Sequence, residues 1–322
     1  MSVLVYTENW DGKFKKLSFE LVSYAAAVAK MMNTSVTALS IGNVSDDELK
    51  TLGKYGAVKI LSAGNEFLSV LDSQAYSAVI SEAALKENAS VIIISNNNTG
   101  KALAPRISVR LKAGVGSGVS RLPVNISPFT VYKRAYSGNA YAHVVIKSDI
   151  KILTLAQNSF DIAETPGDAV IEKISTGADA SLVKTRVKDV KKQTGKMLLT
   201  DADLVVSGGR GMKSPDNWAP LEELAEALGA ATACSRPVSD EGWRPHEEHT
   251  GQTGKIIAPN LYIAVGISGA TQHLAGVSSS KYIVAINSDK DAPIFEAAQY
   301  GIVGDAMKVL PQLVTAAKEL KK

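Results

Sequence analysis

Apolar residues along the first 120 positions fall into two kinds of block. Short runs such as 91–94 are apolar at every position, which predicts strands buried on both faces of a sheet. Longer blocks carry apolar residues three or four positions apart, which predicts helices with one buried face. The two kinds alternate, so we predict a parallel sheet with helices on both faces. The predicted strands are 2–7, 35–41, 58–62 and 91–94, and the predicted helices are 19–32, 46–53, 75–87 and 101–111.

The pattern changes in the next segment of the chain. Residues 114–118 are rich in glycine and predict a turn near a contact surface. They do not match a dinucleotide fingerprint, because no strong apolar strand precedes them and no acidic residue follows at the required distance. Segments 130–136, 141–147 and 151–155 then alternate apolar and polar residues, with a turn at 137–139. This alternation predicts an antiparallel extension at one edge of the sheet.

The helical period is lost over residues 164–194, and we place a domain boundary near residue 190. The mixed-charge run 184–192 is predicted to be a solvated edge strand and linker rather than a nucleic-acid patch. The predicted domains are therefore an N-terminal parallel-sheet α/β domain, 1–190, and a C-terminal doubly wound, Rossmann-like domain, 191–322. The second domain has predicted strands 203–206, 261–267 and 281–286, another short strand just before residues 234–237, and a strand or turn at 301–305. Its predicted helices are 220–228, 293–300, 307–320 and one beginning at Thr271.

Glycine-rich or polar residues follow four predicted strands of the second domain. These strand tips are 207–211, 235–236, 268–273 and Asn287. The ends of parallel strands meet at one edge of a sheet, so we expect the tips to converge. The turn 268–270 also leads into a helix, which leaves backbone N–H groups beside the positive end of the helix dipole. The expected ligand is large, planar and phosphate-bearing.

Composition narrows the class of protein. The net charge of +3 is too small to indicate nucleic-acid binding, and three Trp and six Phe offer no stacking platform. The single cysteine, Cys234, excludes an internal disulfide and fits a reducing compartment. No apolar run approaches the roughly 20 residues of a membrane helix. Met1 leads directly into a predicted strand, so we expect no targeting segment.

Three further features have simpler structural interpretations. His246-Glu247-Glu248-His249 lacks the spacing of a zinc helix and lies in a predicted loop, so no metal site is predicted. Cys234 is expected to be a small buried residue rather than a nucleophile. His273 is either a core histidine or a member of the anion site, and the residues alone leave both open.

Four motifs occur in a specific order in the second domain: VVSGGRG at 205–211, GQTGK at 251–255, LYIAVGISGATQHLAG at 261–276, and IVAIN at 283–287 followed by APIFEAAQYGIVG at 292–304. In these motifs the chain resembles the α subunit of electron transfer flavoprotein. The resemblance implies a heterodimer with a β subunit and one non-covalent FAD. It also implies an electron carrier that turns over no substrate of its own. Electrons would come from dehydrogenases, such as the acyl-CoA dehydrogenases of fatty acid β-oxidation, and pass through an anionic semiquinone to a quinone-reducing oxidoreductase.

The resemblance also implies which residues contact FAD, and it implies no catalytic residue. Arg210 would lie against the cofactor, Ser235 would reach its phosphates and Arg236 its isoalloxazine ring. The ring would be lined by Thr250, Gly251, Gln252 and Thr253, with the Thr253 hydroxyl donating to N5. The diphosphate turn would be formed by Ser268, Gly269, Ala270, Thr271, Gln272 and His273, with His273 near the pyrimidine carbonyl. The ribose and adenine would be held by Asn287, Asp305 and Ala306.

Two positions depart from the family pattern, and several alternatives stay open. His249-Thr250 replaces the usual Gln-Val, which leaves the role of the Thr250 side chain open, and Cys234 stands where a small residue is usual. An electron-bifurcating member of the family is one alternative. A stand-alone NAD(P)-linked oxidoreductase is another, although no G-x-G-x-x-G turn is present. The third is a flavin-free assembly module. The intact Met1 favours the bacterial cytoplasm over the mitochondrial matrix.

Overall fold

The computed structural model describes residues 1–138, 140–165, 167–190 and 197–320. The chain divides into two compact units, residues 1–190 and 191–322. Each unit has its own sheet and its own hydrophobic cores. The predicted fold class, a parallel-sheet α/β domain followed by a doubly wound domain, is confirmed.

Unit 1 is built on a ten-stranded sheet with the order β10-β9-β7-β11-β6-β1-β4-β5-β12, in which β8 pairs with β9. Its strands are β1 (Ser2–Thr7), β4 (Val36–Ile41), β5 (Lys59–Ala63), β6 (Ala89–Ser95), β7 (Gly114–Val119), β8 (Asn125–Ile126), β9 (Phe129–Ala135), β10 (Ala140–Val145), β11 (Lys151–Leu155) and β12 (Val170–Lys173), with a separate hairpin of β2 (Asn9–Trp10) and β3 (Lys13–Phe14). Its helices are α1 (Lys16–Met31), α2 (Asp46–Lys50), α3 (Ser73–Lys86) and α4 (Asn98–Leu111), with short 3-10 turns η1 (Thr51–Lys54), η2 (Glu66–Leu68), η3 (Tyr136–Gly138) and η4 (Ala180–Leu182).

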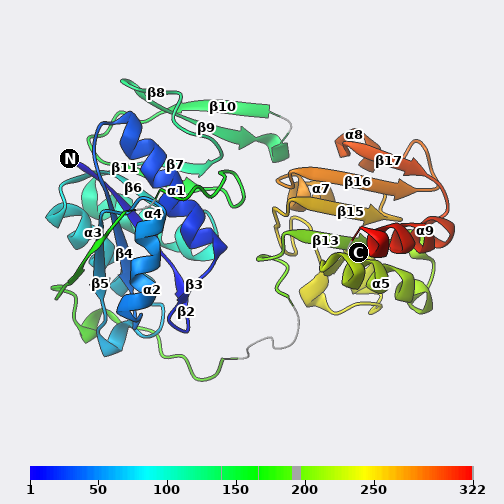
Figure 1. Ribbon diagram of the computed structural model, residues 1–322, viewed down its shortest axis with the longest axis horizontal. Helices are drawn as coiled ribbons and strands as arrows, with labels where there is room; N and C mark the ends of the chain where they lie inside the picture. Colours follow the sequence, from blue (N-terminus) through cyan, green and yellow to red (C-terminus); the bar gives the residue numbers. More distant parts are fainter. Residues whose placement is uncertain (139, 166, 191–196, 321–322) are drawn as a thin grey trace. The chain divides into compact units, whose positions relative to one another are not determined.

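Alternate residues of the central strands serve two cores, one on each face of the sheet. Val3 and Val5 of β1 pack with α1 and α2, whereas Leu4 and Tyr6 pack with α3 and α4. Figure 1 shows these four helices packed around the sheet. All four residues are buried, which explains why β1 reads as an unbroken apolar run. Asp72 begins α3 by accepting hydrogen bonds from two backbone N–H groups of the first turn.

Three predictions for unit 1 are wrong in detail. Residues 114–119 form the inner strand β7 rather than a turn. A Cβ at Gly116 would lie 3.1–3.2 Å from side chains of three neighbours, so the core leaves little space for a side chain at this position. The glycine removes the apolar residue by which a strand is recognised in the sequence. β11 is not part of an antiparallel extension, because it pairs parallel with β6 and β7. The antiparallel part consists of β8, β9 and β10, and it joins the parallel strands through an antiparallel pairing of β9 with β7.

The third error concerns the join between the domains. Residues 184–190 form no strand, and residues 191–192 of the same charged run lie outside the described residues. The edge strand of unit 1 is β12 instead, which pairs parallel with β5. Thr185 follows it and donates a 2.8 Å hydrogen bond to Asp72, so the segment runs beside the start of α3.

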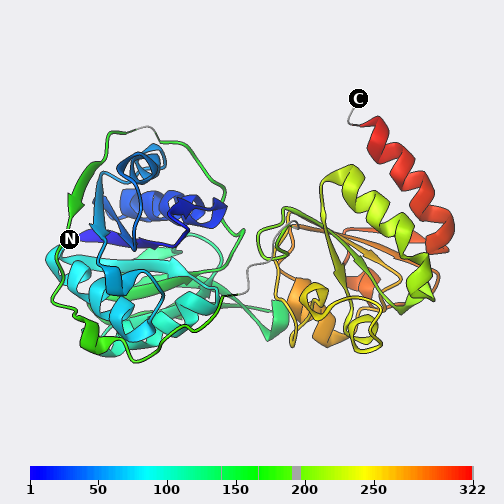
Figure 2. The same cartoon turned by 90° about the horizontal axis from the view of Figure 1, so that it is seen from below.

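Unit 2 contains a five-stranded parallel sheet with the order β14-β13-β15-β16-β17. Helices α5 and α9 cover one face, and Figure 2 shows them side by side; α7 and α8 belong to the core on the other face. The strands are β13 (Leu204–Gly208), β14 (Ala231–Cys234), β15 (Leu261–Val265), β16 (Tyr282–Asn287) and β17 (Tyr300–Val303). The helices are α5 (Ala219–Leu228), α6 (Arg236–Asp240), α7 (Thr271–Val277), α8 (Ile294–Ala297) and α9 (Ala306–Glu319), with 3-10 turns η5 (Arg210–Met212), η6 (Pro215–Trp218) and η7 (His246–Glu248).

The predicted helix 293–300 is too long. Helix α8 stops at Ala297, and the chain is extended from Ala298. Gln299 explains the early end, because its backbone N–H and its side-chain oxygen both bond to Ile283 on β16. Pairing with β16 thus draws residues 300–303 into the sheet as β17.

Candidate functional site

The predicted site residues come from loops at the carboxyl ends of the unit 2 strands or pack directly against those loops. The sheet changes winding direction between β13 and β15, because β14 lies outside β13 and β16 lies outside β15. At this switch point the tips of the two strands pack backbone to backbone: the Gly209 N–H donates to Val265 at 2.8 Å and the Gly211 N–H to Gly266 at 3.0 Å. Open α/β sheets bind ligands at such a point.

The β15 tip needs glycine for space and for conformation. Gly269 has a φ of +88°, and a Cβ there would lie 2.3 Å from the backbone nitrogen of Ile294. The Ile294 N–H donates to the Ser268 carbonyl at 3.0 Å, which fixes the turn against α8. In the described part of the chain, the N–H groups of Ser268, Gly269 and Ala270 donate to no protein acceptor. Adjacent backbone N–H groups without a protein acceptor are donors of the kind that bind phosphate oxygens.

The predicted ring-binding loop, residues 250–253, is anchored at both ends. The Thr250 N–H donates to the Cys234 carbonyl at 3.0 Å, and the Gln252 N–H to the Gln272 carbonyl at 2.7 Å. Gly251 packs against Gly276 of α7, where a Cβ would lie 2.4 Å from the Gly251 Cα. The anchored loop leaves Gln252 and Thr253 exposed. Their side chains are therefore available to a ligand.

Beneath that loop lies a buried polar cluster that joins β15 to α7. The Tyr262 hydroxyl is 2.8 Å from Nε2 of His273, and both side chains are buried. Burial, and then the neighbouring His249, lower the pKa of His273 to about 4, so its ring is neutral at pH 7. The Thr250 hydroxyl also points inward and donates to the Cys234 carbonyl at 3.2 Å. The Thr250 side chain therefore faces the protein interior, and the whole residue is buried beneath the exposed Gln252 and Thr253.

Nitrogen atoms without partners remain in this cluster. Among the described residues, Nδ1 of His273 and Nδ1 of His249 are buried and have no hydrogen-bond partner. Burial lowers the pKa of His249 as well, and the neighbouring His246 lowers it further; the centroids of the two rings are 5.5 Å apart.

Tyr262 could not be singled out from the sequence, because it lies in the middle of the apolar run of β15.

Cationic side chains at the strand tips are paired only weakly. Arg236 Nε lies 3.2 Å from Asp240, and an Arg210 nitrogen lies 3.9 Å from Glu241. Both arginine side chains are about two-thirds exposed, at 64% and 67%. Exposed pairs of this kind contribute little stability. An incoming anion can therefore take over either arginine at small cost.

The remaining predicted residues lie at the tips of β14, β16 and β17. Ser235 is the buried residue between β14 and α6. Asn287 ends β16, and its side-chain amide donates to the Ile267 carbonyl at 2.9 Å. Asp305 begins α9 by accepting from the Met307 N–H at 2.9 Å; this hydrogen bond, and then Lys213, lower the pKa of Asp305. Ala306 is buried beside it.

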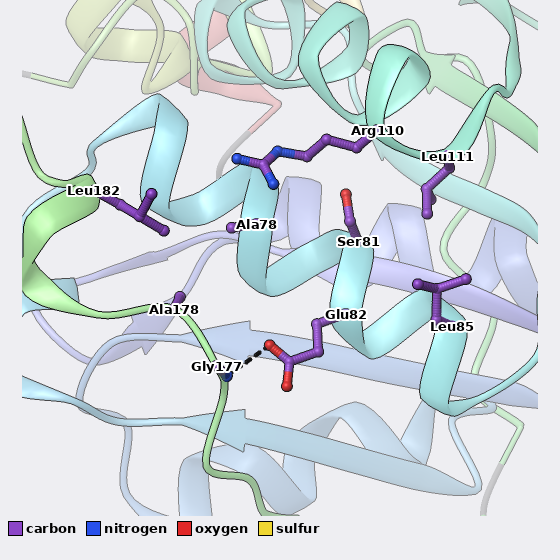
Figure 3. Close-up of a pocket in the computed structure, with 9 residues that line it drawn as sticks. All are labelled: Ala78, Ser81, Glu82, Leu85, Arg110, Leu111, Gly177, Ala178 and Leu182. Atoms are coloured by element: carbon purple, nitrogen blue, oxygen red, sulfur yellow. Dashed lines mark hydrogen bonds between the residues drawn. The ribbon is translucent and has the colours of Figure 1, made fainter.

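A hollow of about 390 Å³ lies in unit 1, between α3, α4 and residues 177–182 (Figure 3). Glu82 accepts a 2.8 Å hydrogen bond from the Gly177 N–H, and Arg110 extends over the apolar lining. None of the predicted site residues line it. Its few polar groups do not converge on one point, so we favour the strand tips of unit 2 as the functional site.

Other features of the sequence are placed as follows. Cys234 is a free, buried residue at the end of β14, as predicted, and burial raises the pKa of its thiol to about 12. Over the residues that the structure describes, no group of three or more His, Cys, Asp or Glu is arranged to hold a metal ion. Nor does any helix in the described ranges have the length and apolar character that crossing a membrane requires.

Comparison with known proteins gives the same result along both units. A model of the electron transfer flavoprotein domain matches residues 3–180, and a model of the electron transfer flavoprotein FAD-binding domain matches residues 198–278. Electron transfer flavoprotein subunit alpha of Syntrophomonas wolfei is 36% identical over 319 residues, covering 99% of this chain and 98% of the relative. The Bacillus subtilis subunit is 36% identical over 323 residues, with 99% and 98% covered, and the Pseudomonas aeruginosa subunit 37% over 317 residues, with 98% and 100% covered. The chain therefore belongs to the electron transfer flavoprotein family, as an α subunit whose second unit is the FAD-binding domain.

Proposed function

We propose that this chain pairs with a β subunit and holds one FAD at the carboxyl edge of the unit 2 sheet. In this role it shuttles electrons from dehydrogenases, such as acyl-CoA dehydrogenases, to a quinone-reducing acceptor in the bacterial cytoplasm. The observation that carries the proposal is the convergence of unpaired backbone donors, two weakly paired arginines and an anchored polar loop at one sheet edge. These groups suit a ligand that is anionic at one end and planar at the other.

The residues present fit FAD group by group. The N–H groups of residues 268–270 would bind the diphosphate, and Asn287 with Asp305 would hold the ribose. Gln252 and Thr253 would line the ring, with Arg236 supplying positive charge beside it. When bound, FAD supplies the electron chemistry, and the protein supplies binding, orientation and electrostatics.

Charge and hydrogen bonds at the ring end would then set the reduction potential. The Arg236 guanidinium would favour negative charge near it. His273 contributes no charge, because its pKa of about 4 keeps the ring neutral. With Nε2 bonded to Tyr262, its only unpaired nitrogen among the described residues is Nδ1. We therefore assign the larger part of the electrostatic stabilisation to Arg236 rather than to His273.

The proposal is tested by co-expressing the chain with its β-subunit partner and measuring the flavin spectrum and flavin content. We expect a yellow complex with one FAD per heterodimer, and Arg236→Ala should weaken FAD binding about tenfold. Arg106→Ala, an exposed arginine on α4 of unit 1, is the matched control and should bind FAD normally. A complex without flavin would refute the proposal and favour an assembly module.

The same preparation separates the remaining alternatives. Two flavins per heterodimer would indicate the electron-bifurcating branch. Tight binding of a nicotinamide nucleotide by the isolated chain would instead support a stand-alone oxidoreductase. Mixing the reduced complex with candidate acceptors, and the oxidised complex with candidate dehydrogenases, would identify the electron-transfer partners.

A further inference from the structure

The tip of β13 ends in a strained turn centred on Lys213. The φ and ψ angles of Lys213 are +70° and −32°, a region that L-residues rarely adopt. The Ser214 N–H donates to the Met212 carbonyl at 2.9 Å, which closes a three-residue γ-turn of the rare, strained kind. Glycine would adopt this conformation without the steric cost. A lysine therefore stands where the backbone alone would favour glycine.

The surrounding structure holds this turn from both sides. Met212 is fully buried in the core beside α5 and α9. The Asn217 side-chain amide donates to the Met212 carbonyl at 2.9 Å, and the Ser214 hydroxyl accepts from the Asp216 N–H at 3.2 Å. The direction in which the Lys213 side chain leaves the backbone is thus decided by packed neighbours. Backbone strain that the surrounding packing enforces in this way is concentrated at functional sites.

Lys213 lies between two parts of the proposed FAD site. The preceding residue, Met212, packs against the β15 tip: a Cβ on Gly266 would lie 3.1 Å from the Met212 nitrogen. Gly266 leads directly into the turn 268–270, whose N–H groups are unpaired. On the other side, Nζ of Lys213 lies 3.3 Å from Oδ2 of Asp305. Its ammonium therefore lies beside the expected ribose-binding residue, and the backbone just before it packs against the strand tip that leads to the expected diphosphate turn.

The pair with Asp305 does not account for the strain. The two side chains are 67% and 39% exposed, and an ion pair in water contributes little stability. The ion pair with Asp305 contributes too little stability to offset the backbone strain at Lys213. Binding of a ligand by the lysine side chain explains the strain better. The expected ligand chemistry is anionic, because Asp305 is an expected ribose-binding residue and residues 268–270 offer N–H groups that have no protein acceptor in the described part of the chain.

We propose that Lys213 is a further cofactor-binding residue, whose ammonium binds the diphosphate of FAD and is held in place by Asp305 in the free chain. This assignment rests on the proposed function. It does not follow from the motif that singled out Arg210, because the sequence shows neither the strained backbone at residue 213 nor its contact with Asp305.

The test compares FAD dissociation constants of the heterodimer carrying Lys213→Met, Lys213→Arg or Lys213→Gly with that of the unmodified complex. Lys213→Met and Lys213→Gly should weaken FAD binding about tenfold or more and reduce its dependence on salt, because a charge-assisted contact is lost. Lys213→Arg should retain most of the affinity. Lys318→Met, which removes another exposed lysine, paired with Glu223 on α5, should change neither quantity.

Lys213→Gly also separates a binding role from a structural one. Relief of strain should raise the melting temperature of the apo-complex above that of Lys213→Met, even though both variants bind FAD weakly. Unchanged affinity and salt dependence in Lys213→Met would overturn the inference while leaving the FAD site intact. A weaker affinity with unchanged salt dependence would also overturn it, since the lysine would then act only through the shape of the turn. Absence of FAD from the unmodified complex would instead count against the proposed function itself.

Discussion

Replacing Gly276 with alanine sets two opposing effects of known size against each other. Gly276 lies in α7, and alanine is favoured over glycine inside a helix by about 1 kcal/mol. The added Cβ, however, would lie 2.4 Å from the Cα and 2.6 Å from the nitrogen of Gly251. Ordinary carbon contacts are near 3.5–4.0 Å, so the two backbones would have to separate by roughly 1 Å. We expect this clash to outweigh the gain in helix propensity.

The cost follows from what holds Gly251 in place. Its N–H donates to the Lys255 carbonyl at 3.1 Å, and the neighbouring Gln252 N–H donates to Gln272 at 2.7 Å. Overpacking a tight site costs about 1–3 kcal/mol, and each distorted hydrogen bond costs about 1 kcal/mol. After subtracting the gain of about 1 kcal/mol, and counting both hydrogen bonds, Gly276→Ala should destabilise unit 2 by roughly 2–4 kcal/mol. It should also weaken FAD binding, because the loop carrying Thr253 is displaced.

Urea unfolding followed by tryptophan fluorescence measures the first effect, because Trp218 and Trp243 report on unit 2. Release of bound flavin on dilution measures the second. Gly64→Ala is a suitable control, since a Cβ there meets only one atom, at 3.8 Å. If Gly276→Ala were as stable as the unmodified chain and bound FAD equally well, the contact between α7 and the loop would not have the role given to it here.

Two further predictions concern stability. The pKa of His273, about 4, lies below the unfolded value of about 6.5, so the unfolded chain binds the extra proton between these pH values. The free energy of unfolding of unit 2 should therefore fall by up to about 3 kcal/mol as pH falls from 6.5 to 4. Urea titrations of His273→Gln should show a smaller fall over the same range. If the pH profiles of the variant and the unmodified chain were parallel, the assignment would be wrong. Asp72→Ala removes the cap of α3 and should destabilise unit 1 by about 1–2 kcal/mol in thermal unfolding. Asp47→Ala, which removes an exposed carboxylate, should have little effect. Equal losses of stability in the two variants would argue against capping.

The alternation of strands and helices in both units could be predicted because it rests on local patterns. A buried parallel strand such as β6 is apolar at every position, and helices of unit 1 and unit 2 repeat their apolar residues at helical spacing. The errors arose where tertiary contacts override the pattern. β7 is a strand in spite of its glycines, because three side chains leave no space around Gly116. α8 is shortened because Gln299 pairs with β16.

The site divides in the same way. The strand tips of unit 2 were identifiable because glycine and polar residues follow apolar runs, and the ends of parallel strands must meet at one edge. The family motifs then singled out particular residues at those tips. No local pattern distinguishes Tyr262 from its apolar neighbours, and none distinguishes Lys213 from other exposed lysines. Both gain their significance from atoms far along the chain, His273 and Asp305.

The sequence by itself therefore determined the order of most elements, the class of fold and the sheet edge at which we propose that FAD binds. These properties depend on the hydrophobicity and backbone preferences of residues that are neighbours in the sequence, so each short segment carries the information by itself. The tertiary structure alone decided that the Thr250 hydroxyl points inward, that His273 is neutral and bonded to Tyr262, and that Lys213 is held in a strained turn beside Asp305. The physical reason is that burial, desolvation and strain are set by which distant segments pack together, and spacing along the chain does not specify them.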